Sequence, residues 1–308
     1  MYNTIQLDKS LYNITGKSFT EALSSVDPDE AYQGTPLAAL DAFERQLKRF
    51  DIRISGKDSD RVEKFFLTKE SAVLFPEFVR RTIKQGMDEV SFLPFIAAAT
   101  SYTDGVDYRG LTVTKSGTDT AVAESASIPE TTVKLASAVS TVSKFARRLT
   151  CSYESVRKQR LEAFGVILRS LGAQISRAVN AAAVSALASG VTATSIAGSD
   201  IAYSDLAAFW ASMGEYDMSV MLVPPAAMAE ILALEEMKYC VGDYMAGGSV
   251  KTPYGVTLIK CPALTTTAVG IDAKCALEAV FATDVIVDFD KLISTQNEEI
   301  ACSVSVGF

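Results

Sequence analysis

The feature that most constrains this chain is a long helical pattern that directly follows a polar, extended stretch. Between Ser152 and Ala188 the sequence has no proline, and its apolar residues recur at spacings of three and four. An average helix has roughly 11–12 residues, so this pattern is about three times as long. At about 1.5 Å per residue, a continuous helix would span on the order of 50 Å. The sequence therefore predicts a rod as long as a domain is wide, which favours a protein that builds a large assembly.

One face of the predicted rod is apolar, as a helix packed along a core requires. The stripe consists of Val156, Phe164, Ile167 or Leu168, Leu171, Ile175, Val179 and Ala182 or Ala183. Gly165 and Gly172 each cost about 1 kcal/mol relative to alanine in a helix interior. We expect these glycines where another backbone approaches closely or where the rod bends. A hinge at either glycine is a hypothesis for how the subunit changes shape.

The extended stretch before the rod, Ser101 to Lys144, is rich in Thr, Ser, Val and Ala, with turn-forming Gly105, Gly110 and Gly117. It predicts two strands joined by a tip around residues 114–120. Few large apolar residues occur there, so this hairpin cannot enclose a core of its own. A long unpaired β arm is an aggregation liability, which favours an arm that lies on a neighbouring molecule.

The N-terminal region predicts short helices with local start signals. Ser18 and Glu21 fit a capping box, in which each side chain accepts from a free backbone N–H. Thr35 and Pro36 predict an N-cap followed by proline at the first helical position. A further helix is expected from Pro76 to Gln85.

Beyond Gly190 the pattern predicts a compact α/β segment and then a return to β structure. The expected helices are 205–213 and 226–238, the expected strands are 218–223, 256–260, 276–281 and 285–289, and a glycine-rich loop covers 242–248. A final alternating strand ends at Phe308, and we expect it to rejoin the earlier sheet.

Composition excludes several classes of function. The net charge is −8 and no basic tract occurs, so the footprint of a specific nucleic-acid binder is missing. No apolar run reaches the roughly 18 residues of a membrane span. Histidine is absent, which removes His-based acid–base chemistry, Ser–His and Cys–His pairs and most zinc sites. Carboxylate-pair and lysine chemistry remain open. The sequence predicts no catalytic residue, no cofactor and no metal.

Five cysteines are scattered without a C-x-x-C pair, which predicts reduced thiols rather than a metal site or a disulfide framework. They are Cys151, Cys240, Cys261, Cys275 and Cys302.

The order of these parts resembles the Hong Kong 97-type major capsid protein of tailed bacteriophages. The likeness is carried by Phe75-Pro76-Glu77, by Val122-Ala123-Glu124 and Ile128-Pro129-Glu130, by the strand and helix of 144–188, and by the terminal Gly307-Phe308. It implies an α+β fold with an N-terminal arm, an extended β loop, a peripheral domain with a long spine helix, and an axial domain. The implied segments are arm 1–72, peripheral 73–102, extended loop 103–136, peripheral with spine helix 137–195, axial 196–274 and a peripheral return at 275–308.

The resemblance implies a structural subunit that self-assembles into pentamers and hexamers of an icosahedral or elongated capsid around double-stranded DNA. It implies a portal as partner, with scaffolding or decoration proteins as further candidates, no membrane, and assembly in the bacterial cytoplasm. The region before the peripheral domain is short and starts at Met1, which suggests a separate scaffolding protein or none. Glu124, Glu130, Lys115, Lys134, Arg157 and Arg169 are the expected inter-subunit contacts.

The founding member of the family joins its subunits by a lysine–asparagine isopeptide bond that a glutamate promotes. Here Lys115 or Lys134, with Asn297 and Glu298 or Glu299, supplies the residue types; the alternative is that these are ordinary solvated residues. Two other functions stay open. One is an encapsulin-like nanocompartment shell that stores an enzyme cargo, and the other is a cytosolic α+β enzyme whose site the sequence does not reveal.

Overall fold

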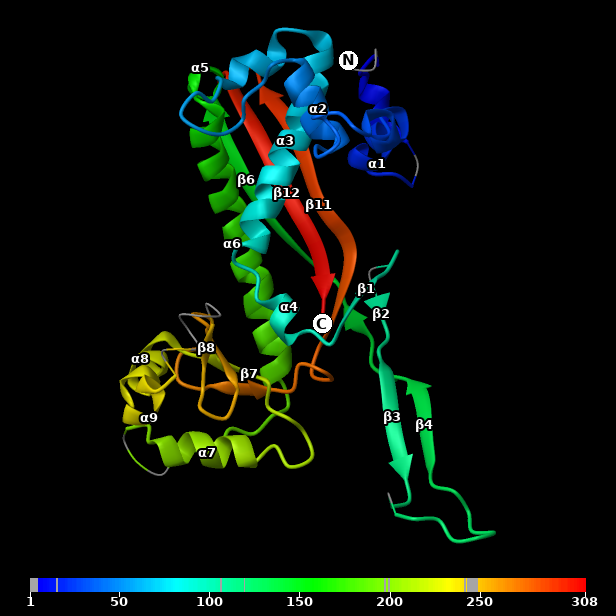
Figure 1. Ribbon diagram of the computed structural model, residues 1–308, viewed down its shortest axis with the longest axis vertical. Coiled ribbons are helices and arrows are strands. Elements are labelled where there is room, and N and C mark those ends of the chain that lie inside the picture. The colour runs from blue at the N-terminus through cyan, green and yellow to red at the C-terminus, as the bar shows by residue number, and fades with distance from the viewer. Residues whose placement is uncertain are drawn as a thin grey trace. The chain divides into compact units, whose positions relative to one another are not determined.

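The computed structural model describes residues 5–14, 16–105, 107–118, 120–196, 198, 200–240, 242 and 249–308 (Figure 1). The chain divides into two compact units, each made of three separated stretches. Unit 1 comprises Met1–Ser91, Ala146–Arg177 and Val285–Ser303; unit 2 comprises Phe92–Phe145, Ala178–Asp284 and Val304–Phe308.

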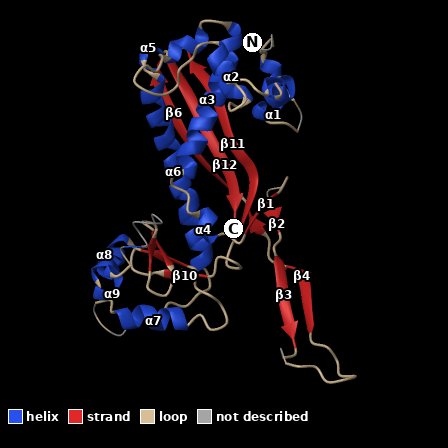
Figure 2. Ribbon diagram, in the orientation of Figure 1, coloured by secondary structure: helices blue, strands red, loops and turns tan. Residues whose placement is uncertain are grey.

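Unit 1 is built from helices that lie along long strands (Figure 2). Its helices are α1 (Phe19–Val26), α2 (Ala42–Arg49), α3 (Lys69–Asp88), α5 (Tyr153–Lys158) and the first part of α6 (Leu161–Ala188), with 3-10 turns η1 (Lys9–Asn13), η2 (Asp29–Tyr32) and η3 (Val62–Phe66). Its strands are parts of β6 (Ser143–Ser152), β11 (Glu278–Leu292) and β12 (Asn297–Gly307).

Local capping chemistry decides where the N-terminal helices begin. The capping box of Ser18 and Glu21 is present at the start of α1, which confirms the prediction. The helix predicted at Thr35-Pro36 is wrong, because the Thr35 hydroxyl donates back to the Tyr32 carbonyl and residues 35–40 form turns. The next helix, α2, starts instead at Asp41, which forms its own capping box with Glu44.

Helix α3 starts earlier than predicted. Thr68 caps it in a capping box with Ser71, so the helix begins at Lys69 and Pro76 lies in its interior rather than at its start. A proline inside a helix removes one backbone hydrogen bond. The favourable start at Thr68 therefore outweighs the start signal that Pro76 offers.

The predicted rod from Ser152 to Ala188 is not continuous. Ser152 caps α5, which ends where Gln159 adopts an extended conformation with ψ of 147°. The Val62 N–H donates to the Gln159 carbonyl at 3.0 Å, and the Leu161 N–H donates to the Asp60 carbonyl at 2.7 Å. These bonds to a segment a hundred residues away interrupt the helix. The remaining 28-residue α6 is about 42 Å long.

The two glycines of α6 have different surroundings. A Cβ on Gly172 would lie 2.0 Å from the Ile83 carbonyl oxygen of α3, and one on Gly86 of α3 would lie 2.1 Å from the Arg169 carbonyl oxygen. The prediction of a close backbone is thus confirmed at Gly172. At Gly165 the nearest atom would be the Thr82 Cγ2 at 3.7 Å, an ordinary contact.

Phe75 of α3 stands at the centre of an aromatic cluster in unit 1. Its ring centroid lies 6.3 Å from Phe164 of α6, 5.8 Å from Phe289 of β11 and 5.6 Å from Phe65 of η3. The sheet to which β11 belongs has the order β1-β11-β12-β6, where β1 is Ala99–Tyr102 and runs parallel to β11. The last strand of the chain returns to this earlier sheet, as predicted. The two strands expected at 276–281 and 285–289 form the single strand β11.

Unit 2 contains a second sheet of order β10-β7-β9-β8. The strands of this sheet are β7 (Val220–Val223), β8 (Val250–Lys251), β9 (Thr257–Lys260) and β10 (Val269–Ile271). The helices of unit 2 include α4 (Leu93–Ile96), α7 (Tyr203–Ala211), α8 (Pro225–Ala233) and α9 (Glu235–Lys238). The helix predicted at 226–238 is split because Leu234 turns extended and packs against the methionine-rich core. The predicted glycine-rich loop lies almost wholly outside the described residues.

All five cysteines are free, and burial makes two of them poor nucleophiles. Burial raises the pKa of the Cys151 thiol and of the Cys302 thiol to about 11. At pH 8 about one thiol in a thousand is then ionised. We expect iodoacetamide at pH 8 to leave Cys151 and Cys302 unmodified in the folded protein, and to label all five after denaturation. Rapid labelling of both in the native protein, read by mass spectrometry, would contradict these thiol environments.

Candidate inter-subunit interface

The extended hairpin belongs to unit 2 and consists of β3 (Leu111–Ser116) and β4 (Glu130–Leu135). The strands are antiparallel, with Leu111 opposite Leu135 and Val113 opposite Val133. The tip predicted around residues 114–120 is wrong in position, because β3 continues to Ser116 and the connecting loop covers 117–129. The reason is that Thr114 and Lys115 pair with Thr132 and Thr131 of β4.

The two faces of the hairpin differ in chemistry, since alternate residues of a strand point to opposite faces. One face carries two cross-strand apolar pairs. The exposed fraction is 66% for Leu111, 59% for Val113, 55% for Val133 and 66% for Leu135. The other face is polar and carries Thr112, Thr114, Ser116, Glu130, Thr132 and Lys134. A water-exposed two-stranded hairpin with one apolar face is marginal alone, so this face calls for a partner surface.

The base of the hairpin is anchored by polar contacts within unit 2. The Tyr108 hydroxyl donates to Glu278 Oε1 at 2.7 Å, and the Ser101 hydroxyl donates to the same oxygen. The bond to the Glu278 carboxylate raises the pKa of Tyr108. Short strands β2 (Asp107–Tyr108) and β5 (Ser140–Thr141) pair antiparallel beside it. These contacts position the root of an otherwise exposed arm.

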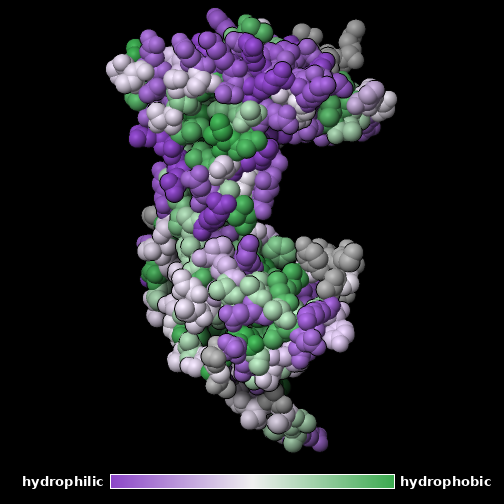
Figure 3. Space-filling view, turned by 90° about the vertical axis from the view of Figure 1, so that its left-hand side faces the viewer, coloured by the Kyte–Doolittle hydropathy of each residue, from purple (hydrophilic) through white to green (hydrophobic). Residues whose placement is uncertain are grey.

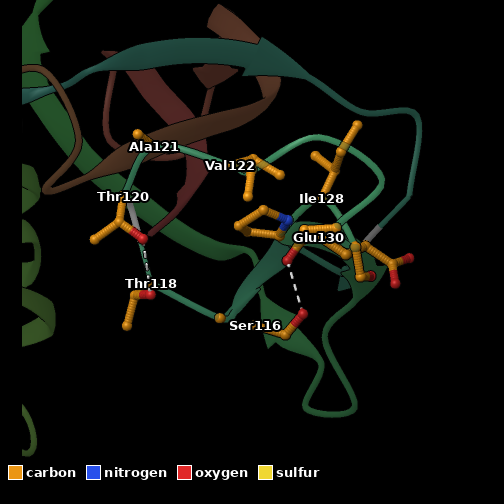
Figure 4. A pocket seen from close by; sticks show the side chains of 12 residues that line it. Ser116, Thr118, Thr120, Ala121, Val122, Ile128 and Glu130 are labelled. Carbon is orange, nitrogen blue, oxygen red and sulfur yellow. Dashed lines mark hydrogen bonds between the residues drawn. The ribbon is translucent and has the colours of Figure 1, made fainter.

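The loop at the end of the hairpin surrounds an open hollow of about 590 Å³ (Figure 4). The Thr118 and Thr120 hydroxyls form a hydrogen bond with each other at 3.3 Å. The Ser116 hydroxyl donates to the Glu130 carbonyl at 3.1 Å. Both bonds are drawn in Figure 4. Small hydroxyl and aliphatic side chains form the lining, and Glu130 is its charged member. Among the residues that the structure describes here, Glu130 has no second titratable side chain beside it in the lining with which it could form an acid–base pair.

Four of the six predicted contact residues share the hairpin. Lys115 lies in β3, Glu130 and Lys134 lie in β4, and Glu124 lies in the exposed turn of the loop. The structure thus brings these four onto one arm. Their role toward another subunit stays a prediction.

The two predicted arginines lie in unit 1, and Arg157 contacts aromatic rings of its own chain. The Arg157 guanidinium stands 6.0 Å from the Phe66 ring and 5.8 Å from the Tyr153 ring. Arg169 is half-buried on α6. An exposed guanidinium over aromatic rings adds about 0.5–1 kcal/mol to the stability of its own subunit, and a role at an interface stays a prediction.

The residues considered for an isopeptide bond also have local partners. Asn297 opens β12, and buried Glu298 lies 4.0 Å from the Lys291 ammonium. Glu299 accepts from Arg148 and from the Thr150 hydroxyl, both at 3.2 Å. A covalent link to Lys115 or Lys134 of another subunit stays a prediction.

Sequence reasoning missed Leu111 and Val113, which form half of the apolar face. The alternation Leu111-Thr112-Val113-Thr114 has the same period of two as Val133 and Leu135. Aligning the two segments as an antiparallel pair would have predicted the shared apolar face.

A sequence model of the family described as "Phage capsid protein" matches residues 135–297, more than half of the chain. This chain belongs to the phage capsid protein family. No curated protein sequence matches this capsid protein significantly.

A similar solved structure shows the fold. A virus-like particle from Pyrococcus furiosus matches with a TM-score of 0.54 and 11% identity, over 75% of this capsid protein and 93% of that chain. The Mycobacterium phage Adephagia structure matches with a TM-score of 0.49 and 10% identity, over 70% of this capsid protein and 82% of that chain. The capsid of the native GTA particle matches with a TM-score of 0.47 and 14% identity, over 74% and 86%.

These findings confirm the predicted α+β, Hong Kong 97-type capsid fold and the predicted role as a structural capsid subunit of a phage virion. In the described part of the chain, no helix is both long enough and apolar enough to span a membrane. The same residues contain no group of three or more His, Cys, Asp and Glu side chains that could hold a metal ion.

Proposed function

We propose that this capsid protein assembles into pentamers and hexamers of an icosahedral or elongated tailed-phage shell, and that the hairpin is its main link between neighbours. The observation that carries this proposal is the exposed apolar face of Leu111, Val113, Val133 and Leu135. Burying such a side chain fully is worth about 1.5–3 kcal/mol. Repeated in every subunit, a contact of this size adds up over a closed shell.

The surface that receives the hairpin is proposed to be the peripheral part of an adjacent subunit. Figure 3 looks onto the α6 side and shows hydrophobic side chains at the surface among hydrophilic ones. On α6, Val166 and Ile167 expose 54% and 47% of their side chains. This exposed apolar pair on α6 is chemically matched to the apolar face of the hairpin. We propose that charged contacts at the rim of this interface set the register of the hairpin on the neighbouring subunit. The residues are Arg157, Arg169, Lys115, Lys134, Glu124 and Glu130.

The domain division that follows is arm 1–72, peripheral 73–102, 137–195 and 275–308, extended loop 103–136 and axial 196–274. The axial segment would surround the five- and six-fold axes. We further propose that the shell encloses double-stranded DNA without specific affinity, which fits the net charge of −8. Assembly in the bacterial cytoplasm, a portal as partner, scaffolding or decoration proteins as further partners, and a role without catalysis complete the proposal.

The test is to express the full chain alone, separate it by size exclusion and image it by negative-stain electron microscopy. The expected result is closed particles or five- and six-membered rings, formed by the chain alone or after addition of a scaffolding partner. Native particles should contain nuclease-protected DNA. Particles that enclose a defined enzyme and no DNA would support a nanocompartment shell instead, and a persistent monomer under all these conditions would reject self-assembly.

A further inference from the structure

An exposed aromatic patch with an arginine at its centre lies where η3 meets α5 in unit 1. The Arg157 guanidinium of α5 lies 6.0 Å from the centre of the Phe66 ring and 5.8 Å from the centre of the Tyr153 ring. Phe66 is 41% exposed, and Leu67, the next residue, is 74% exposed. Within the described part of the chain, Arg157 contacts these rings and forms no ion pair. We call Phe66, Leu67, Tyr153 and Arg157 the η3–α5 patch.

The composition of the η3–α5 patch is that of a protein–protein contact. Aromatic residues and arginine are enriched in such contacts and carry much of their binding energy. A guanidinium stacked on aromatic rings can still donate two parallel N–H bonds to one carboxylate. The patch therefore fits a partner that combines a carboxylate with exposed aliphatic side chains.

The loop at the end of the hairpin has this chemistry. Residues 117–130 contain three acidic residues and no Lys or Arg; two of the acids, Glu124 and Glu130, lie within the described residues. Glu124 is exposed and is flanked by Val122, which is 45% exposed, and Ile128, which is 78% exposed (Figure 4). The loop is thus complementary to the patch in charge and in apolar character.

The backbone places Glu124 at the apex of a tight turn. The Ala126 N–H donates to the Ala123 carbonyl at 3.1 Å and closes the turn. Its third residue, Ser125, has a φ of 64°, a left-handed conformation that residues other than glycine and asparagine rarely adopt. Such strain persists where surrounding contacts fix it. Because Ser125 is exposed in the subunit, a contact with a second molecule accounts for the shape of this turn.

The proposed contact between the hairpin and α6 brings the loop to the η3–α5 patch. From Val113 to Ser116, three strand residues cover about 10 Å. From Val166 back to Leu161, the first residue of α6, five helical residues cover about 8 Å. Helix α5 ends at Lys158, three residues before Leu161. When the hairpin lies on Val166 with its tip toward the start of α6, its loop therefore reaches α5 of the same neighbour.

We propose that the turn 123–126 of one subunit docks on the η3–α5 patch of a second subunit, and that Glu124 pairs there with Arg157. This inference rests on the proposed shell function and deepens it, because it names the contact and the direction of the hairpin along α6. The aliphatic side chains on either side of the turn cover the exposed part of the patch. They exclude water from the ion pair and so strengthen it.

The test is a charge swap in the full chain, under the conditions in which the natural chain forms particles. Glu124→Arg opposes two cations and should lower the particle yield at least about tenfold. Arg157→Glu should have the same effect. The double variant restores an ion pair of reversed sense, so its yield should return to within about threefold of the natural chain. Sedimentation and electron microscopy measure the yield.

Lys158→Glu is the matched control, because Lys158 is exposed and lies next to Arg157 on α5. Combined with Glu124→Arg, it restores the same net charge without placing a carboxylate at position 157, so the yield should stay low. Circular dichroism should show every variant folded, because the substituted side chains are exposed in the subunit. Equal rescue by the two substitutions on α5 would reduce the effect to net charge. A double variant of Glu124→Arg and Arg157→Glu that stays low would reject the pairing.

A photo-cross-link gives a second readout that does not depend on yield. Benzoylphenylalanine replaces Ile128, and this chain is co-assembled with isotope-labelled natural chain, so that links between subunits carry the label. After irradiation, mass spectrometry should find these links at Phe66, Leu67 or Tyr153. Particles in which position 128 links only to other segments would overturn the docking and leave the shell proposal standing. A natural chain that forms neither particles nor rings would reject the proposed function and the docking with it.

Discussion

Replacement of Gly172 by alanine is expected to destabilise the subunit by about 2–4 kcal/mol and to lower its apparent Tm by roughly 5 °C or more. The added Cβ would lie 2.0 Å from the Ile83 carbonyl oxygen and 3.0 Å from the Met87 N of α3. Both are backbone atoms, so no side chain can turn aside and the two helices must separate. The loss exceeds the gain of about 1 kcal/mol that alanine brings to a helix interior. Thermal unfolding followed by circular dichroism measures it.

Gly165→Ala is the matched control, because it makes the same change in the same helix, seven residues earlier. Its Cβ meets Thr82 Cγ2 at 3.7 Å, an ordinary van der Waals contact. We expect this variant to be more stable than the natural protein by about 0.5–1 kcal/mol. Effects of equal sign in the two variants would contradict the close crossing of α3 and α6 at Gly172.

Substitution of lysine at both Val113 and Val133 is expected to abolish shell formation while leaving the subunit folded. These residues face each other across the hairpin and are 59% and 55% exposed in the single subunit. In the proposed shell, Val113 and Val133 are both buried between subunits. The variant would therefore place two ammonium groups in an apolar contact. The penalty of several kcal/mol recurs in every subunit. Particle yield by sedimentation and electron microscopy gives the result.

The paired variant Thr114→Lys and Thr132→Lys has the same charge and the same cross-strand geometry on the opposite, polar face. It should retain most of the particle yield. Both double variants should unfold within about 0.5 kcal/mol of the natural protein, because the substituted side chains are largely exposed in the subunit. Equal loss of assembly in both variants would show that the apolar face has no special role.

What the sequence predicted well depends on contacts between near neighbours. The Ser18 and Glu21 box lies within one helical turn, and the alternation of Val133 and Leu135 in β4 spans a few residues. The start at Thr35-Pro36 failed because Asp41 and Glu44 offer a competing box six residues later. Where two local start signals are of similar strength, the tertiary contacts decide which of them begins the helix.

Features that depend on distant segments were not predictable. The break between α5 and α6 arises from bonds of Gln159 and Leu161 to residues 60–62, and nothing in the local pattern marks it. Glu77 looks like one charged residue on a helix, whereas the structure buries it and bonds its carboxylate to the Thr20 hydroxyl, 57 positions earlier in the chain. The family resemblance still indicated the fold, because it depends on the order of the elements along the whole chain. An error in the bounds of one element does not change that order.

The most direct measurement is a cryo-electron microscopy map of the assembled particle. We expect the map to show that the apolar face of the hairpin is buried against the helical surface of a neighbour that includes Val166 and Ile167. That face consists of Leu111, Val113, Val133 and Leu135. A map in which the hairpin stands in solvent with both faces exposed, while the shell is closed by other contacts, would contradict it.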